Sequence, residues 1–284
     1  MTGVQTCALP IWNLRKVLSA AATDFEKAFS LGSVCFNAED ALMISTDGHR
    51  MHMVGADVTR NMLVPAGVLK KLIAGKKDDA EITLSAEKQS PTLEVPEGLK
   101  KADLIELWKE HSGETLSAGM TIADIREKMV RKPEGPKFAY MFDGNREITM
   151  RLLDGTFPDY KAVMNKPESS GTLTVKAGTL TEGMRQALAL TTTDWMAVKV
   201  SFNGGIDLET EVAGDSYNRA SVKIESGGVE PPVSHNYNAR HIVGILSLFK
   251  STDELTLTVP PGTTPLFFND NAGFEALVMP TRVA

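Results

Sequence analysis

The sequence contains little cysteine and no long apolar run. Only 2 of its 284 residues are Cys, and neither Cys7 nor Cys35 lies in a CxxC or Cys/His pattern, which excludes a disulfide scaffold and favours a reducing compartment. A helix that spans a membrane needs about 18 or more consecutive apolar residues. The sequence contains no such stretch. With 23% charged and 42% hydrophobic residues, the composition excludes a disordered chain. The length of 284 residues indicates about two globular domains. Because a reducing compartment is expected, the cytoplasm is the simplest location.

The first residues are unusual. Thr2–Ile11, TGVQTCALPI, has neither the basic start nor the apolar core of a signal peptide. Back-translated, the segment resembles, over ten successive codons, an adapter oligonucleotide used in high-throughput sequencing. We therefore expect residues 1–11 to be a non-native adapter translation, with a chance N-terminal strand as the alternative. An independently prepared library that reads the same start would contradict the adapter origin.

An internal repeat is the strongest pattern in the chain. Residues 66–84 align without a gap on residues 239–257, at an offset of 173, and apolar positions match apolar positions. In both copies helical spacing is followed by the alternation of a strand. An earlier helix, around Leu14–Leu18, matches Met184–Leu188 at an offset of 170. The sequence predicts an α+β fold of two homologous domains, each built from antiparallel sheet and two helices.

The remaining segments fit this plan. Alternation and turn residues predict strands at 33–36, 41–45, 52–54, 81–85, 138–142, 147–152, 199–202, 207–212, 220–224, 254–259 and 275–279. Helical runs at 99–111 and 121–131 have no counterpart in the second copy. We therefore place an insertion at 97–136 within a first domain of residues 12–164, followed by a second domain of residues 165–284.

Catalytic signatures are scarce. The chain has no Walker loop, GxGxxG, HExxH or GxSxG motif. Asp47 and His49, followed by His52, could form part of a hydrolase site, but Gly48 favours a turn in which Asp47 caps backbone N–H groups. The five His are scattered along the chain, so we expect no metal, no cofactor and no enzymatic activity.

Cations recur on the predicted helices of both copies. On a single helix, such cations more often form a solvent-exposed face than a recognition surface. If the helices of both copies share one face, these cations would neutralise phosphates without reading bases, despite the net charge of -6. The residues expected to face DNA are Arg15, Lys16, Lys70, Lys71, Arg185 and Arg240.

Three motifs resemble the bacterial β sliding clamp, the processivity subunit of DNA polymerase III. They are STDGHRMHM at Ser45–Met53, RLLDGTFPDYKAV at Arg151–Val163, and VMPTR at Val278–Arg282. The resemblance covers residues 12–96 and 137–284, which correspond to the second and third domains of that family. It implies a DNA-clamp fold in which six similar domains form a ring with helices lining the hole. The implied partners are double-stranded DNA, the polymerase catalytic subunit, the clamp loader, other polymerases and repair proteins.

The resemblance also implies a groove that receives an extended peptide through Leu and Phe side chains. Carried over position by position, its residues are Thr46, Gly48, His49, Arg50, Met51, Pro158, Val163, Val278, Met279, Pro280, Thr281 and Arg282. Two positions depart from the family: Thr281 stands where Met is usual, and Ala162 replaces a common basic residue. Both departures bear on pocket depth and peptide preference.

Assembly is left with alternatives. The family implies a homodimeric ring of three-domain subunits, which a two-domain fragment would not close. A ring of three two-domain subunits is the second possibility. A hydrolase using Asp47 and His49 and an interaction scaffold that never encircles DNA remain alternatives to the clamp function.

Overall fold

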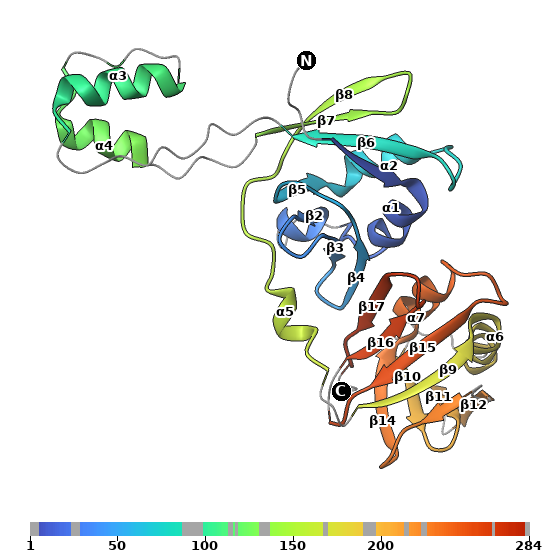
Figure 1. Cartoon of the computed structure of the whole chain (residues 1–284). Helices are drawn as coiled ribbons and strands as arrows, with labels where there is room; N and C mark the ends of the chain where they lie inside the picture. The colour runs from blue at the N-terminus through green and yellow to red at the C-terminus, as the bar shows by residue number, and fades with distance from the viewer. Residues whose placement is uncertain are drawn as a thin grey trace.

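Two similar domains and a helical hairpin make up the chain (Figure 1). The structure, a computed structural model, describes residues 6–23, 29–86, 99–112, 116, 119–130, 137–166, 170–189, 197–212, 216–222, 226–262 and 265–281. Within these residues the strand pairings are antiparallel, so the predicted α+β class is confirmed.

The first domain contains two sets of strands and two helices. One sheet, ordered β1-β6-β7-β8, consists of β1 (Thr6–Pro10), β6 (Glu81–Ala86), β7 (Phe138–Phe142) and β8 (Glu147–Arg151). The second set, ordered β4-β3-β2-β5, consists of β2 (Ser33–Asn37), β3 (Leu42–Thr46), β4 (Arg50–Gly55) and β5 (Met62–Pro65). The helices are α1 (Ile11–Leu18) and α2 (Ala66–Ile73), and a 3-10 turn spans Phe29–Gly32.

The second domain repeats this plan. One set, ordered β13-β9-β15-β16-β17, consists of β9 (Gly171–Lys176), β13 (Ser226–Gly228), β15 (Glu254–Val259), β16 (Leu266–Asn269) and β17 (Phe274–Val278). The other, ordered β12-β11-β10-β14, consists of β10 (Ala197–Phe202), β11 (Ile206–Val212), β12 (Ser216–Val222) and β14 (Val233–Asn238). Its helices are α6 (Ala177–Leu188) and α7 (Ala239–Leu246).

The repeat predicted at an offset of 173 is confirmed in the folded chain. Helix α7 starts and ends 173 positions after α2, and β15 does so after β6. The same helical positions are buried: Ala66, Leu69, Leu72 and Ile73 in α2, and Ala239, Ile242, Ile245 and Leu246 in α7. This spacing puts one apolar face of each helix into the core.

Matching hydrogen bonds support the repeat. The hydroxyl of Ser45 donates to the carbonyl of Val17, and the hydroxyl of Thr210 donates to the carbonyl of Ala187. In both domains, therefore, a buried hydroxyl anchors the end of the first helix. The hydroxyl lies on β3 in the first domain and on β11 in the second. The two domains share packing details as well as element order.

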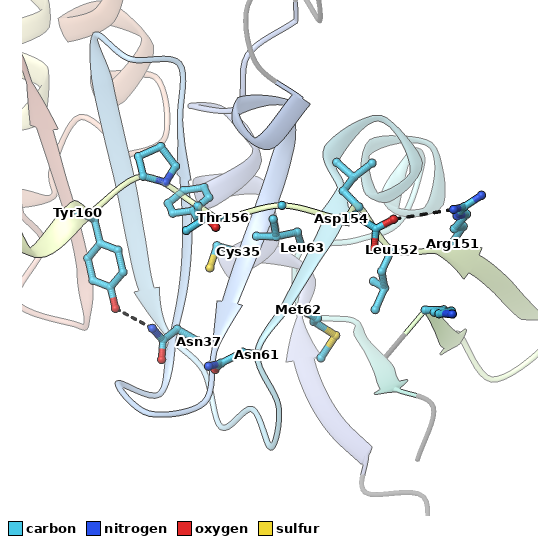
Figure 2. Close-up of a pocket in the computed structure, with 15 residues that line it drawn as sticks. Cys35, Asn37, Asn61, Met62, Leu63, Arg151, Leu152, Asp154, Thr156 and Tyr160 are labelled. Carbon is cyan, nitrogen blue, oxygen red and sulfur yellow. Dashed lines mark hydrogen bonds and ion pairs between the residues drawn. The ribbon is translucent and has the colours of Figure 1, made fainter. Parts of the chain in front are cut away.

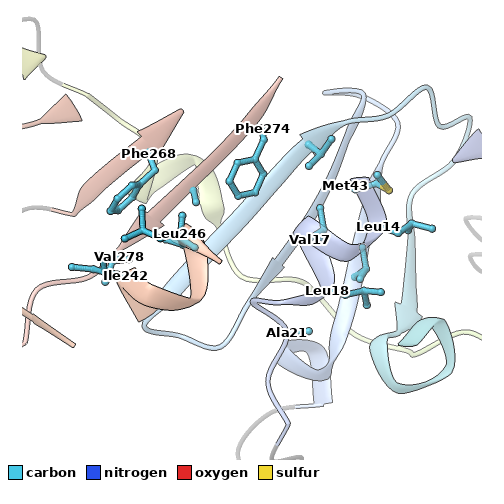
Figure 3. Packing of buried hydrophobic residues seen from close by; sticks show 14 of the residues in the cluster. Leu14, Val17, Leu18, Ala21, Met43, Ile242, Leu246, Phe268, Phe274 and Val278 are labelled. Carbon is cyan, nitrogen blue, oxygen red and sulfur yellow. The ribbon is translucent and has the colours of Figure 1, made fainter. Parts of the chain in front are cut away.

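Among the described residues, one pair of strands joins the domains. β17 pairs with β4 from Phe274 opposite Val54 to Val278 opposite Arg50, so strands of both domains form one nine-stranded sheet. A shared apolar core continues across this joint, and Figure 3 shows α1 and β17 contributing to it from the two domains. Backbone pairing and apolar burial thus act at the same place.

A buried ion pair reinforces the joint. Nζ of Lys16 on α1 lies 2.5 Å from the carboxylate of Asp270, and both side chains are below 10% exposed. The rings of Trp12, Phe249 and Phe274 surround the ammonium at 5.2 to 5.4 Å from their centroids. Burial opposes ionisation of Asp270, but Lys16 and two backbone N–H groups hold the pKa of that carboxyl below its ordinary value. Lys16 therefore links α1 to the β16–β17 turn of the second domain.

The predicted insertion contains two helices that stand apart from the domains in Figure 1. They are α3 (Lys101–Ser112) and α4 (Ile122–Val130), close to the predicted runs. Leu104, Leu116 and Ile125 form a small cluster of their own. The hairpin thus has a local core, although its role and the predicted domain boundaries stay predictions.

Several strands were not predicted. β5 is buried along most of its length and has no alternation, whereas β14 is polar at the edge of its sheet. β1 lies in the segment interpreted as an adapter translation; it pairs with β6 and buries Leu9, as the alternative of an N-terminal strand expects. The pairing describes how these residues pack, and their non-native origin stays a prediction.

Lys16→Met should strongly destabilise the chain. Removing one partner of a buried ion pair leaves an uncompensated charge and costs about 3–5 kcal/mol. Urea unfolding should show this loss, whereas Lys161→Met, which breaks an exposed pair with Asp40, should change little. Equal effects of the two variants would contradict the role assigned to Lys16.

Acid should weaken the joint through His52. The Nδ1 atom of His52 donates to the carbonyl of Lys16 at 2.8 Å, the ring contacts Phe274, and burial lowers the pKa of His52 to about 4. Because an unfolded His has a pKa near 6.5, the unfolded chain binds more protons between about pH 6.5 and 4, and stability falls across that window by on the order of 3 kcal/mol. In His52→Gln this pH dependence of urea midpoints should flatten; an unchanged slope would contradict it.

Candidate functional site

The site is built around the turn between β3 and β4. The Asp47 carboxylate accepts the backbone N–H groups of His49 and Arg50, each at 3.0 Å, and also lies 2.9 Å from Nε of Arg50. Gly48 has a φ of 88°, a conformation that glycine adopts without steric cost. Asp47 and Gly48 therefore fix the backbone, as the turn interpretation of this motif predicts.

The C-terminal strand runs directly beside this turn. Pairing of β17 with β4 places Leu277 opposite Met51. The N–H of Met279 then donates to the carbonyl of His49 at 2.8 Å. Two sequence motifs more than 200 residues apart thus meet at the joint between the domains.

The linker between the domains forms a third wall. It contains α5 (Tyr160–Val163), which Asp159 caps by accepting the N–H of Lys161. The hydroxyl of Tyr160 accepts a hydrogen bond from Asn37 at 2.8 Å and donates to Asp40. Lys161 also pairs with Asp40, at 2.8 Å. These contacts hold α5 against the first domain.

The three walls enclose a cavity of about 160 Å³. It is lined by Leu31, Thr46, Gly48, Arg50, Met51, Pro158, Asp159, Val163, Leu277 and Met279. Met51, Leu277 and Met279 belong to an apolar cluster that also includes Val163, while Thr46, Arg50 and Asp159 add polar groups. We define this cavity as the joint pocket.

Most of the predicted groove residues meet at the joint pocket. Thr46, Gly48, Arg50, Met51, Pro158, Val163 and Met279 line it. His49, Val278, Pro280 and Thr281 lie next to it in the chain but are not among the lining residues, and Arg282 lies outside the described residues. Leu31, Asp159 and Leu277 were missed, although alternation along β17 would have placed Leu277 on the same face as Met279.

The hydrolase alternative finds little support. Asp47 is used in backbone and Arg50 contacts, while the ring of His49 stacks on His241 with centroids 6.0 Å apart. His52 is buried. In the described part of the chain, no group of three His, Cys, Asp or Glu side chains could hold a metal ion. The geometry is that of a structural turn beside a pocket.

The cations predicted to face DNA occupy different environments. Lys70, Lys71, Arg185 and Arg240 are exposed, and partial desolvation together with the Arg50 charge lowers the pKa of Lys70. Arg15 is half-buried and pairs with Asp78 at 2.9 Å. In Figure 1 the four helices that carry these residues lie on the side opposite α5.

Lys16 is a correction to that set. Its side chain is buried and its ammonium pairs with Asp270, so it cannot present a charge to a phosphate. Helical spacing could not reveal this, because the acidic partner lies 254 positions away in the second domain.

A second, larger groove lies on the other side of the linker. Its volume is about 870 Å³, and residues 151–158 and Tyr160 run along it opposite β2 and β5. Figure 2 shows Tyr160 bonded to Asn37 at one end and Arg151 beside Asp154 at the other. The Arg151–Val163 motif runs along this groove, although the sequence did not predict a groove there.

No protein-family model and no curated protein matches the chain. Its fold does match solved structures. The DNA polymerase III subunit beta from Borrelia burgdorferi has a TM-score of 0.70 and 16% identity, with 99% of this chain and 65% of that chain covered. The DNA polymerase sliding clamp from Bacillus subtilis has a TM-score of 0.72 and 14% identity, with 100% and 66% covered.

A third example is the DNA polymerase III subunit beta from Pseudomonas aeruginosa, with a TM-score of 0.67, 15% identity and coverage of 100% and 68%. The chain spans about two thirds of the length of these neighbours. At this identity the likeness establishes that the chain has the sliding-clamp fold. No helix among the described residues is long and apolar enough to cross a membrane.

Gly48→Ala should loosen the turn. A φ of 88° places an alanine in a strained region, although nothing within 4 Å would meet its Cβ, so we expect a loss of roughly 1–2 kcal/mol in urea unfolding. Gly67→Ala is the matched control: its surroundings are also open, and alanine inside α2 should stabilise by up to about 1 kcal/mol. The same sign for both variants would contradict the explanation.

Proposed function

We propose that this chain acts as a sliding clamp, a processivity factor that encircles duplex DNA and docks its partners at the joint pocket. The observation that carries the proposal is the convergence of seven residues from both domains, all implied by the family resemblance, around one apolar cavity. The sliding-clamp fold supports it independently.

The joint pocket suits an extended peptide with apolar anchors. Met51, Leu277 and Met279 provide an apolar surface for a Leu or Phe side chain, and Arg50 and Thr46 stand beside them to orient the peptide. The hydrogen bonds of Asp47 within the turn and the strand pairing keep this surface formed before a partner arrives, which lowers the ordering cost of binding. Thr281 and Ala162 would then adjust peptide preference at the edges.

The exposed cations on the helices suit a DNA partner that is retained because the ring encircles it. Lys70, Lys71, Arg185 and Arg240 offer sequence-independent contacts to phosphates. A ring that encircles DNA does not need tight binding to stay on it. The negative net charge of -6 is therefore compatible with a DNA partner. The partners implied are double-stranded DNA, the catalytic subunit of DNA polymerase III, the clamp loader, other polymerases and repair proteins, in the cytoplasm, with no catalysis by this chain.

A peptide titration tests the docking function. A labelled peptide of the Gln-x-x-Leu-Phe type should bind with micromolar affinity, about -8 kcal/mol. Met279→Asp places a charge in the apolar pocket and should weaken binding at least tenfold, as followed by fluorescence polarisation. Ile122→Asp, on the separate helical hairpin where Ile122 is exposed, is the control and should bind like the parent chain. Equal binding by both variants would contradict docking at the joint pocket.

A further inference from the structure

The surface of α7 that lies outside the core contacts the turn of the candidate site. Ile242, Ile245 and Leu246 are buried in the core, as Figure 3 shows for Ile242 and Leu246. His241 and Gly244 are half-buried and lie three residues apart, so they are neighbours on the surface of the helix. Both contact the turn between β3 and β4, which belongs to the first domain.

Gly244 provides space for a side chain of the other domain. A Cβ atom at position 244 would lie 2.8 Å from Nη1 of Arg50, well inside the separation of about 3.5–4.0 Å at which nonbonded carbon atoms rest. Glycine is unfavourable in the interior of a helix, and Gly67 on α2 has open space around it instead. The Arg50 guanidinium can therefore keep its place against α7 only while residue 244 has no side chain.

The Arg50 guanidinium is thus held between two domains. Its Nε lies 2.9 Å from the Asp47 carboxylate of the first domain, and its Nη1 lies against Gly244 of the second. Arg50 also lines the joint pocket. A guanidinium carries five N–H donors, whereas a peptide carbonyl or carboxylate oxygen is an acceptor. The place of the guanidinium therefore decides which acceptor oxygens of a docked peptide it can reach.

A ring on the same face of α7 lies within range of the Arg50 charge. The His241 ring stacks on that of His49, with centroids 6.0 Å apart and an angle of 14° between the planes. Burial lowers the pKa of His241 from its ordinary value, the Asp47 charge raises it, and the charges of Arg50 and His49 lower it. The pKa of His241 therefore depends on how close the guanidinium lies to α7.

We propose that Gly244 is a positioning residue of the joint pocket, which holds the Arg50 guanidinium where it donates to an acceptor oxygen of the docked peptide. This inference rests on the proposed function, because it concerns affinity at the same site. Gly244 is not among the residues that line the pocket, so it acts through Arg50. The second domain then supplies apolar surface through Leu277 and Met279 and also fixes a donor that belongs to the first domain.

A double-mutant cycle on peptide binding tests this role. Gly244→Ala should weaken binding of the Gln-x-x-Leu-Phe peptide roughly tenfold in fluorescence polarisation, the scale of one lost hydrogen bond to a charged group. Its urea midpoint should not fall, because alanine favours the helix and the flexible end of Arg50 can move aside. In an Arg50→Met background, where no guanidinium remains, Gly244→Ala should change the affinity by less than about twofold.

Gly67→Ala is the matched control, since it makes the same change in a helix with open space, and it should bind like the parent chain. Equal losses of affinity from Gly244→Ala in both backgrounds would overturn the proposal. A lower urea midpoint together with weaker binding would also overturn it, because general loss of packing would then explain the weaker binding.

An NMR titration of His241 tests the place of Arg50 without a peptide. In Gly244→Ala the guanidinium moves away from α7, so the pKa of His241 should rise toward its ordinary value, and Gly67→Ala should leave it unchanged. In the Arg50→Met background, Gly244→Ala should not raise that pKa further. An unchanged pKa in Gly244→Ala would overturn the role of Gly244, whereas absence of peptide binding by the parent chain would count against the docking function itself.

Discussion

The pairing of β17 with β4 is the constraint on which the rest of the molecule depends. It turns strands from two domains into one nine-stranded sheet and fixes the position of the C-terminal residues beside the turn at Gly48. Without it, Met51 and Leu277 would belong to separate surfaces. The joint pocket is therefore a property of the relation between the domains.

The pairing is supported by burial on both sides of the sheet. On one side, the ion pair of Lys16 and Asp270 lies among aromatic rings, and His52 is packed next to it. On the other, Tyr160 and Phe267 join the apolar cluster under α5. A rigid joint of this kind suits the proposed docking function, because both domains contribute to one preformed surface.

Much of this arrangement could be predicted from the sequence, because it depends on hydrophobic periodicity and on local motifs. Helices α2 and α7 were found through equivalent apolar positions, and the turn at Asp47 through its turn residues. The groove residues came from a family resemblance, and the structure brings seven of them together. Two kinds of feature were missed. Lys16 was assigned to a surface because its partner Asp270 is remote in sequence. β5 and β14 were not found because they lack the alternation that marks a half-buried strand. β9 does alternate, with Leu173 and Val175 buried, and could have been found.

Hydrogen exchange of the chain with and without a Gln-x-x-Leu-Phe peptide would test the central claim most directly. If partners dock where the domains meet, the peptide should protect residues 46–51 and 277–281 together, at the same peptide concentrations. Protection confined to one domain, or to the large groove beside residues 151–158, would contradict the account.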